Sequence, residues 1–141
     1  MLVKAKVLII DASESTRTFM RFILSNSGFR ISVASTAAKA LEEIEDQNFD
    51  VIVIDPRTPD MDGLDLVREI RSVKAFSEIP ILAVTQFFNT DAQDDQKAAG
   101  ISHWITQPVS PHKLIGLVDS ISPAPEMFDD EMINELIKQE K

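Results

Sequence analysis

The stretch VIVID at residues 51–55 places four β-branched residues in a row and ends them with an aspartate. A short, continuous apolar run of this kind is typical of a strand that is buried on both faces of a parallel sheet. Similar runs occur at residues 7–10 (VLII) and 81–84 (ILAV), and weaker strand patterns cover residues 30–34 and 101–105. The sequence therefore predicts five short strands.

Amphipathic helical patterns follow each of these strands. Their starts are marked by residues that commonly cap or open helices, namely Ser13, Thr36, Gly63, Thr90 and the pair Ser110-Pro111. Two of the patterns end at glycines, residues 28 and 100. Alternating strands and helices predict an α/β fold in which helices cover both faces of one parallel sheet, and right-handed crossovers leave few topologies for it.

Polar residues stand where three of the predicted strands end. Asp11 follows residues 7–10, Asp55 ends the run at 51–54, and Thr85 follows residues 81–84. Ligands of such sheets bind beyond the carboxyl ends of the strands, where these three side chains converge if their strands are neighbours. Two carboxylates held together need a cation or a proton, and Mg²⁺ is commonly bound by one or two carboxylates plus waters. The pattern predicts a magnesium site and an aspartate that accepts a phosphoryl group.

The chain resembles the response-regulator receiver domains of two-component signalling over residues 4–121. The segments that carry the resemblance are residues 6–13, 53–63, 80–85 and 104–108. The most specific of them is DPRTPDMDG at 55–63, which is similar to the family pattern of Asp, three residues, Pro and Met-Asp-Gly. The resemblance implies a flavodoxin-like, doubly wound sheet of five parallel strands in the order 2-1-3-4-5.

The resemblance also implies a role for each site residue. Asp55 is the phosphoacceptor, and Asp11, Asp55 and the backbone carbonyl of Arg57 hold Mg²⁺. Thr85 and Trp104 are switch residues that carry the change to the surface of the fourth helix, fifth strand and fifth helix. The donor is the phosphohistidine of a histidine kinase or phosphotransfer protein, and the output is binding to a downstream protein target. Such a domain is a signalling module and not an enzyme.

Three positions depart from the family pattern where the chemistry takes place. Ala12 stands where the family usually has the second of two adjacent acids, so we expect weaker binding of Mg²⁺. Gln107 stands where the family usually has a lysine, and it can donate a hydrogen bond but cannot neutralise a phosphoryl oxygen. The neutral hydrogen bond of a glutamine is roughly half as strong as the charge-assisted bond of a lysine. Gln86 adds bulk where the family has a small residue. The site is therefore predicted to be partly degraded. The resemblance further implies a cis peptide bond between Gln107 and Pro108.

Several of these side chains have alternative interpretations. Arg57 either stays solvated, which we expect, or folds back onto Asp55 and supplies the charge of the missing lysine. Trp104 is either the aromatic switch or a half-buried ring packed at the edge of its strand. Thr85 either forms part of the switch, which we favour, or simply ends a strand. The whole chain has an alternative too, a phosphorylation-independent pseudo-receiver that acts as a protein–protein interaction module.

Composition narrows the possible functions further. The 141 residues are 44% apolar, which suits one domain, and a net charge of −9 argues against direct binding to nucleic acid. The absence of cysteine excludes disulfides and thiol catalysis. No apolar run approaches the roughly 20 residues that span a membrane, and no secretory signal is visible. We expect a cytoplasmic protein.

The C-terminal segment has a composition of its own. Residues 1–122 are predicted to form the receiver domain and residues 123–141 an acidic, amphipathic helix that is appended to it. Its apolar residues Phe128, Met132 and Leu136 recur at helical spacing after a proline-containing linker. This helix either packs on its own domain or docks onto a partner, including a second copy in a homodimer.

Overall fold

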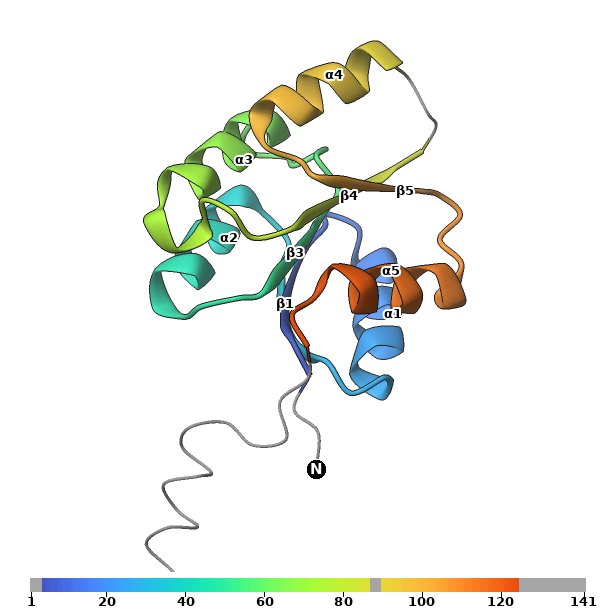
Figure 1. The fold of residues 1–141 in the computed structure, drawn as a ribbon. Coiled ribbons are helices and arrows are strands. Elements are labelled where there is room, and N and C mark those ends of the chain that lie inside the picture. The colour runs from blue at the N-terminus through green and yellow to red at the C-terminus, as the bar shows by residue number, and fades with distance from the viewer. Residues whose placement is uncertain (1–3, 87–89, 125–141) are drawn as a thin grey trace, which may run out of the picture.

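The computed structural model describes residues 4–86 and 90–124, without the side chains of residues 90 and 91 (Figure 1). Its strands are β1 (Lys6–Ile10), β2 (Arg30–Ala34), β3 (Val51–Ile54), β4 (Ile81–Thr85) and β5 (His103–Thr106). Its helices are α1 (Glu14–Asn26), α2 (Ala37–Asp46), α3 (Gly63–Ser72), α4 (Thr90–Ala99) and α5 (Pro111–Ile121), with a 3₁₀ turn η1 (Lys74–Phe76). The apolar residues of the predicted appended helix, and its docking, lie outside the described residues.

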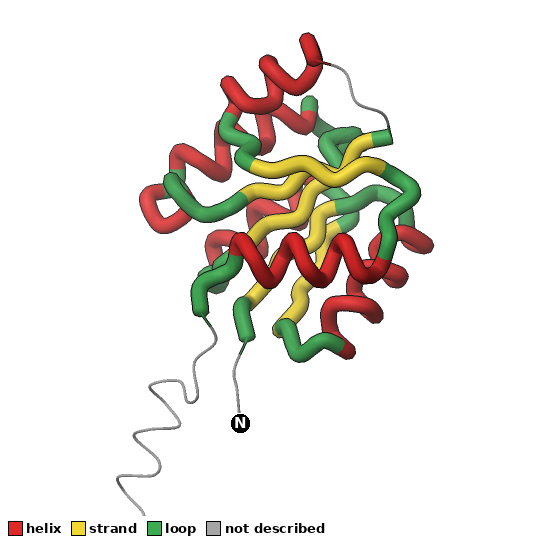
Figure 2. Tube along the Cα trace, turned by 45° about the vertical axis from the view of Figure 1, so that its right-hand side comes forward, coloured by secondary structure: helices red, strands yellow, loops and turns green. Residues whose placement is uncertain are grey.

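The strands form one parallel sheet in the order β2-β1-β3-β4-β5, which confirms the flavodoxin-like topology. Helices α1 and α5 cover one face of this sheet, and α2, α3 and α4 cover the other (Figures 1 and 2). Because successive strand residues point to opposite faces, Leu8 and Ile10 of β1 join one apolar core and Val7 and Ile9 join the other. Two apolar cores therefore pack against the sheet, one on each face.

The predicted helix starts are partly confirmed. Ser13 and Thr36 cap α1 and α2 by accepting hydrogen bonds from the backbone N–H groups of residues 16 and 39. Ser110 occupies the cap position of α5 without a side-chain bond. Helix α3 begins at Gly63 because the side chain of Asp62 caps it, and α4 begins at Thr90 itself.

Two strand boundaries differ from the predicted ones. Residues 101 and 102 precede β5 because they belong to the turn after α4, in which Gly100 has a φ of +124° and the N–H of Ile101 binds the carbonyl of Gln96. Thr85 is the last residue of β4 and pairs with Thr106 instead of following the strand.

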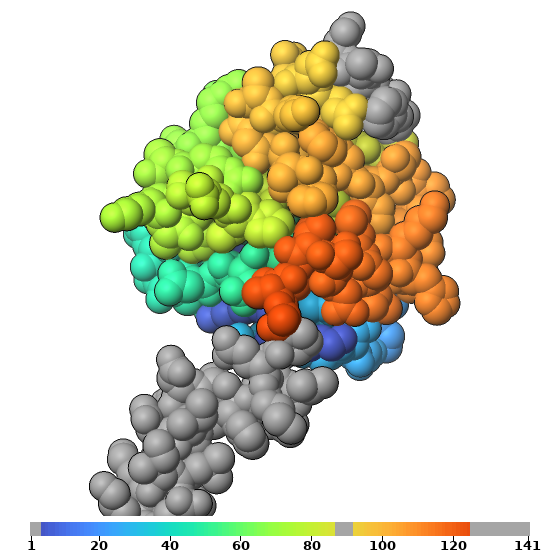
Figure 3. Space-filling model, viewed as in Figure 1, coloured from blue at the N-terminus to red at the C-terminus, as the bar shows by residue number. Residues whose placement is uncertain are grey.

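The elements after β4 meet at one surface. Residues of α4, β5 and α5, coloured yellow through orange to red, form a continuous band over the face shown in Figure 3. This is the surface to which the switch residues were expected to report. Within residues 4–86 and 90–124, no helix combines the length and apolarity needed to cross a bilayer.

Candidate functional site

Two aspartates lie side by side at the carboxyl ends of the central strands. The last residues of β1 and β3, Ile10 and Ile54, are paired in register, so Asp11 and Asp55 each stand one residue beyond neighbouring strands. A hydrogen bond of 2.9 Å from the N–H of Asp55 to the carbonyl of Ile10 ties the two loops together. Asp11 is 2% exposed and Asp55 is 5% exposed, and they are the only buried charged residues in the described part of the chain. The predicted convergence of these carboxylates is confirmed.

Both aspartates close their loops in the same way. The N–H of Ser13 donates to Oδ1 of Asp11 at 2.8 Å, and the N–H of Arg57 donates to Oδ1 of Asp55 at 3.0 Å. Such turns, in which an aspartate accepts from the backbone two residues on, reverse the chain directly after a strand. The backbone therefore aims both carboxylates at the same edge of the sheet.

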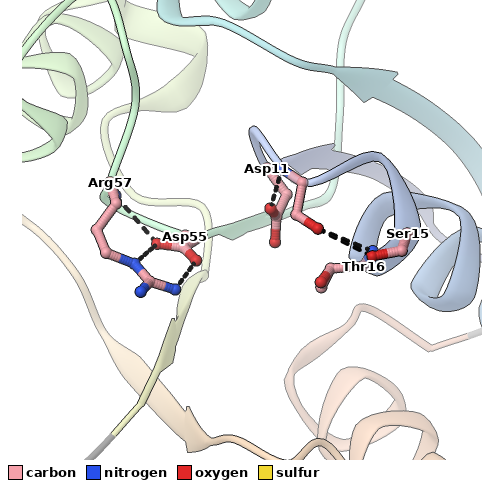
Figure 4. A network of polar contacts seen from close by, with 6 residues as sticks. Asp11, Ser15, Thr16, Asp55 and Arg57 are labelled. Carbon is pink, nitrogen blue, oxygen red and sulfur yellow. Dashed lines mark hydrogen bonds and ion pairs between the residues drawn. The ribbon is translucent and has the colours of Figure 1, made fainter.

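The side chain of Arg57 folds back onto Asp55 (Figure 4). Its Nε donates to Oδ1 at 3.0 Å and its Nη2 donates to Oδ2 at 2.6 Å, which makes a bidentate ion pair. The hydrogen bonds to Asp55 raise the pKa of the guanidinium above its usual range. The expectation of a solvated Arg57 was therefore wrong, because the turn at Asp55 brings the arginine stem within reach of the carboxylate, while the side chain stays 57% exposed.

Asp11 has no comparable partner. Its Oδ2 is buried and accepts no hydrogen bond. Burial raises the pKa of the Asp11 carboxyl, and the charge of Asp55 adds to this, against the opposing effects of the Ser13 N–H and the charges of Arg57 and Arg17. The guanidinium of Arg17 binds the carbonyls of Asp11 and Ala12, at 2.8 and 3.2 Å, and not the carboxylate.

The predicted switch residues share a cavity with Asp55, the predicted acceptor. A cavity of about 190 Å³ is lined by Asp55, Arg57, Thr85, Gln86 and Trp104, together with residues of α4. The Trp104 ring is half-buried, and its Nε1 donates to Oε1 of Gln96 at 2.7 Å. The packed ring that we considered for Trp104 is what the structure shows, whereas its role as a switch stays a prediction.

Of the three departures from the family pattern, Gln86 lines the cavity that also contains Asp55. Ala12 is exposed. Gln107 and Gln86 line a second, wider hollow between the start of α1 and the loop after β5, which Phe19 also borders. The peptide bond between Gln107 and Pro108 is cis, as expected.

Sequence reasoning missed two residues that shape this end of the molecule. Asp60 accepts hydrogen bonds from the N–H groups of Ala37 and Ala38, which hold the pKa of its carboxyl below the usual range and anchor the loop after β3 to α2. Gln96 was missed because its bond to Trp104 joins α4 to β5. Neither contact has a local pattern that could have revealed it.

The residues present fit a hard cation at Asp11. Among the described residues, no group of three or more histidine, cysteine, aspartate or glutamate side chains is positioned to hold a metal. A metal would thus be held by the two aspartates, the carbonyl of Arg57 and waters, the oxygen set that Mg²⁺ accepts. The unpartnered Oδ2 of Asp11 suits such an ion, whereas at Asp55 the guanidinium already occupies the carboxylate.

The family model described as response regulator receiver domain matches residues 7–119 of this chain. The chain belongs to this family. Receiver domains are signalling modules of two-component systems that interact with histidine kinases or phosphotransfer proteins and with downstream targets, and they typically bind Mg²⁺ in the active site.

Two curated relatives illustrate the match. Chemotaxis protein CheY1 of Helicobacter pylori is 33% identical over 112 residues, which cover 77% of this chain and 90% of CheY1. The alkaline phosphatase synthesis transcriptional regulatory protein PhoP of Bacillus subtilis is 30% identical over 142 residues. That alignment covers 94% of this chain but 57% of PhoP, so the chain spans little more than half of that regulator.

Solved structures agree with this assignment. Chemotaxis response regulator CheY4 of Vibrio cholerae is 29% identical and superposes with a TM-score of 0.80, over 84% of this chain and 98% of CheY4. The receiver domain of sensor histidine kinase PA1611 of Pseudomonas aeruginosa shares the fold, with a TM-score of 0.77 at 23% identity over 84% and 97% of the two chains. In that protein a magnesium ion is coordinated in the active-site cleft.

Proposed function

We propose that Asp55 is the phosphoryl acceptor of this receiver domain and that the donor is a phosphohistidine of a histidine kinase or phosphotransfer protein. The observation that carries the proposal is a buried carboxylate at the end of β3 that shares a cavity with the Thr85 hydroxyl and stands beside the unpartnered oxygen of Asp11. Phosphoryl transfer depends mainly on positioning and on charge neutralisation. These groups can supply the positioning, and a Mg²⁺ ion held by the two carboxylates would supply the neutralisation.

The transfer needs one carboxylate oxygen as nucleophile. An oxygen of Asp55 forms a bond to phosphorus, the P–N bond of the donor breaks, and its electron pair stays on the imidazole. Asp11, Asp55 and the carbonyl of Arg57 would hold Mg²⁺, which when bound neutralises charge on the phosphoryl oxygens. Thr85 lines the same cavity as Asp55, and its hydroxyl would donate a hydrogen bond to an oxygen of the transferred phosphoryl group. Trp104, in that cavity too, would carry the change to the surface of α4, β5 and α5.

The experiment is phosphorylation by acetyl phosphate in the presence of Mg²⁺, followed by intact-mass measurement. We expect one phosphoryl group on the wild-type chain, lost on treatment with hydroxylamine as an acyl phosphate is, and none on Asp55→Asn. The matched control Asp94→Asn, an exposed aspartate of α4, should accept it like the wild type. An adduct that persists in Asp55→Asn would overturn the assignment.

A second pair of substitutions tests the degraded positions. Ala12→Asp with Gln107→Lys restores the family pattern at two sites, and we expect the adduct to form faster and at lower Mg²⁺ concentration. If neither the wild type nor this variant is modified by acetyl phosphate, phosphoramidate or a phosphotransfer protein, the interaction module that needs no phosphorylation becomes the better account.

A further inference from the structure

We propose that the side chain of Arg57 is an internal cation that competes with Mg²⁺ for Asp55, so that Arg57 determines how much Mg²⁺ the site requires. The inference rests on Asp55 being the acceptor, as proposed above. It assigns to Arg57 a positioning role through its side chain, in addition to the metal-binding role of its backbone carbonyl.

The hydrogen bonds at Asp55 leave little room for two further bonds. An ionised carboxylate offers about four acceptor positions on its two oxygens. Oδ1 accepts from both the backbone N–H and Nε of Arg57, and Oδ2 accepts from Nη2. A single position on Oδ2 then remains, whereas a metal bond and a new bond to phosphorus need two. The guanidinium must therefore release at least one oxygen before both bonds can form.

The charges at the site point the same way. In the described structure the guanidinium of Arg57 is the cation that contacts the acceptor, because Arg17 is directed at backbone carbonyls. Figure 4 shows Arg57 and Asp11 on opposite sides of Asp55, with only Arg57 in contact with it. The guanidinium therefore neutralises Asp55 but leaves Oδ2 of Asp11 without a partner. Mg²⁺ bound between the aspartates would be repelled by the guanidinium, and its binding would be weakened by that repulsion.

Arg57 is able to move without disturbing the fold. Its side chain is 57% exposed, and the contact that shapes the loop is the bond from its backbone N–H, which does not depend on the guanidinium. The stem can thus swing into solvent while the turn at Asp55 stays closed. Moving the guanidinium away from Asp55 breaks an ion pair whose arginine is largely exposed to water, and such pairs contribute little to the free energy of folding.

The experiment is a calorimetric titration of the full chain with MgCl₂. We expect Arg57→Ala to bind Mg²⁺ roughly threefold to tenfold more tightly than the wild type, and Arg57→Lys, which keeps the charge, to lie closer to the wild type. The matched control is Arg68→Ala. Arg68 is 55% exposed and pairs with Asp65 on the surface of α3, so its removal makes the same change in net charge away from the site.

A second readout links affinity to chemistry. The Mg²⁺ concentration that gives half of the maximal phosphorylation rate with acetyl phosphate should fall in Arg57→Ala by the same factor as the Mg²⁺ dissociation constant. Unchanged or weaker binding in Arg57→Ala, an equal tightening in Arg68→Ala, or no detectable binding in either protein would overturn the inference. Tighter binding without an adduct on Asp55 would instead overturn the proposed function and leave the competition standing.

Discussion

Asp11 and Asp55 occupy equivalent places in the sheet and differ in how their charge is handled. Each follows the end of a central strand, each is buried, and each accepts a hydrogen bond from the N–H two residues on. At Asp55 that second residue is Arg57, whose guanidinium pairs with the carboxylate. At Asp11 it is Ser13, whose hydroxyl instead caps α1, so Oδ2 of Asp11 has no partner.

One side chain per loop therefore decides what each carboxylate needs. The two aspartates are alike in burial and backbone geometry. Arg57 neutralises Asp55, whereas Ser13 carries no charge, so Asp11 still requires a cation or a proton. If Arg57 competes with Mg²⁺ as proposed, this pair of carboxylates binds the metal more tightly once the guanidinium has left Asp55. Four substitutions test this comparison.

The largest effect is expected from Gly63→Ala, which disturbs the contact between α3 and the loop after Asp55 and leaves the Asp11 loop unchanged. A Cβ at residue 63 would lie 1.8 Å from the backbone carbonyl oxygen of Pro56, so α3 and the loop between Asp55 and Arg57 cannot both keep their places. We expect a loss of about 3 kcal/mol or more in the free energy of unfolding, measured by urea denaturation. Gly116→Ala on α5 should gain up to about 1 kcal/mol, because the added Cβ meets nothing within 4 Å apart from its chain neighbours and the backbone of its own helix. Equal stability of the two variants would contradict this reading of the loop.

Asp11→Asn should stabilise the metal-free protein at neutral pH. Because the pKa of Asp11 is raised in the folded state, the native protein binds this proton more tightly than the unfolded chain, and stability falls as pH rises through the raised value. Asparagine keeps an oxygen for the N–H of Ser13 and removes the buried charge. We expect Tm to rise by about 4 °C at pH 7 in EDTA, and the gain to disappear below the usual pKa of 3.8. The control is Glu42→Gln, an exposed acid of α2 that should show no such gain. A gain that does not depend on pH would argue against the buried charge as its cause.

Ser13→Ala should have a smaller effect, and in the opposite direction. The hydroxyl of Ser13 accepts from the N–H of Thr16 at 3.3 Å in an exposed position, so its loss should cost about 0.5 kcal/mol at the start of α1. The turn at Asp11 uses only the backbone of Ser13 and should persist. Chemical denaturation measures the cost, and an unchanged gain from Asp11→Asn in the Ser13→Ala background would show that cap and turn act independently.

Asp55→Asn should change stability least. Asp55→Asn removes the ion pair with Arg57, which destabilises the fold, and it also removes the repulsion between the two carboxylates, which stabilises it. Because the two effects offset each other, we expect the free energy of unfolding to change by less than about 0.5 kcal/mol in metal-free protein at pH 7. In the Arg57→Ala background that offset is gone, and Asp55→Asn should then stabilise in the manner of Asp11→Asn. Thermal melts of the four proteins in this cycle provide the measurement, and the comparison between the two aspartates fails if Arg57→Ala makes no difference.

Much of this site could be predicted because it follows from local patterns. Apolar runs gave the strands, and the aspartates after the runs at 7–10 and 51–54 were expected to converge, as they do. The caps at Ser13 and Thr36 were read from residue type alone. The rotamer of Arg57 was predicted wrongly, since a stem of that length has solvated and folded-back positions that only its surroundings separate.

The sequence by itself determined the order of elements, the α/β class and which residues stand at the strand ends, because hydrophobic periodicity and caps act over a few neighbouring residues. Only the tertiary structure decided that Gly63 must lack a side chain against Pro56, that Gln96 holds Trp104, and that Asp55 is paired while an oxygen of Asp11 is not. These three features depend on distances between atoms of different loops, helices and strands and on the solvent exposure of each atom. No local sequence pattern determines either quantity.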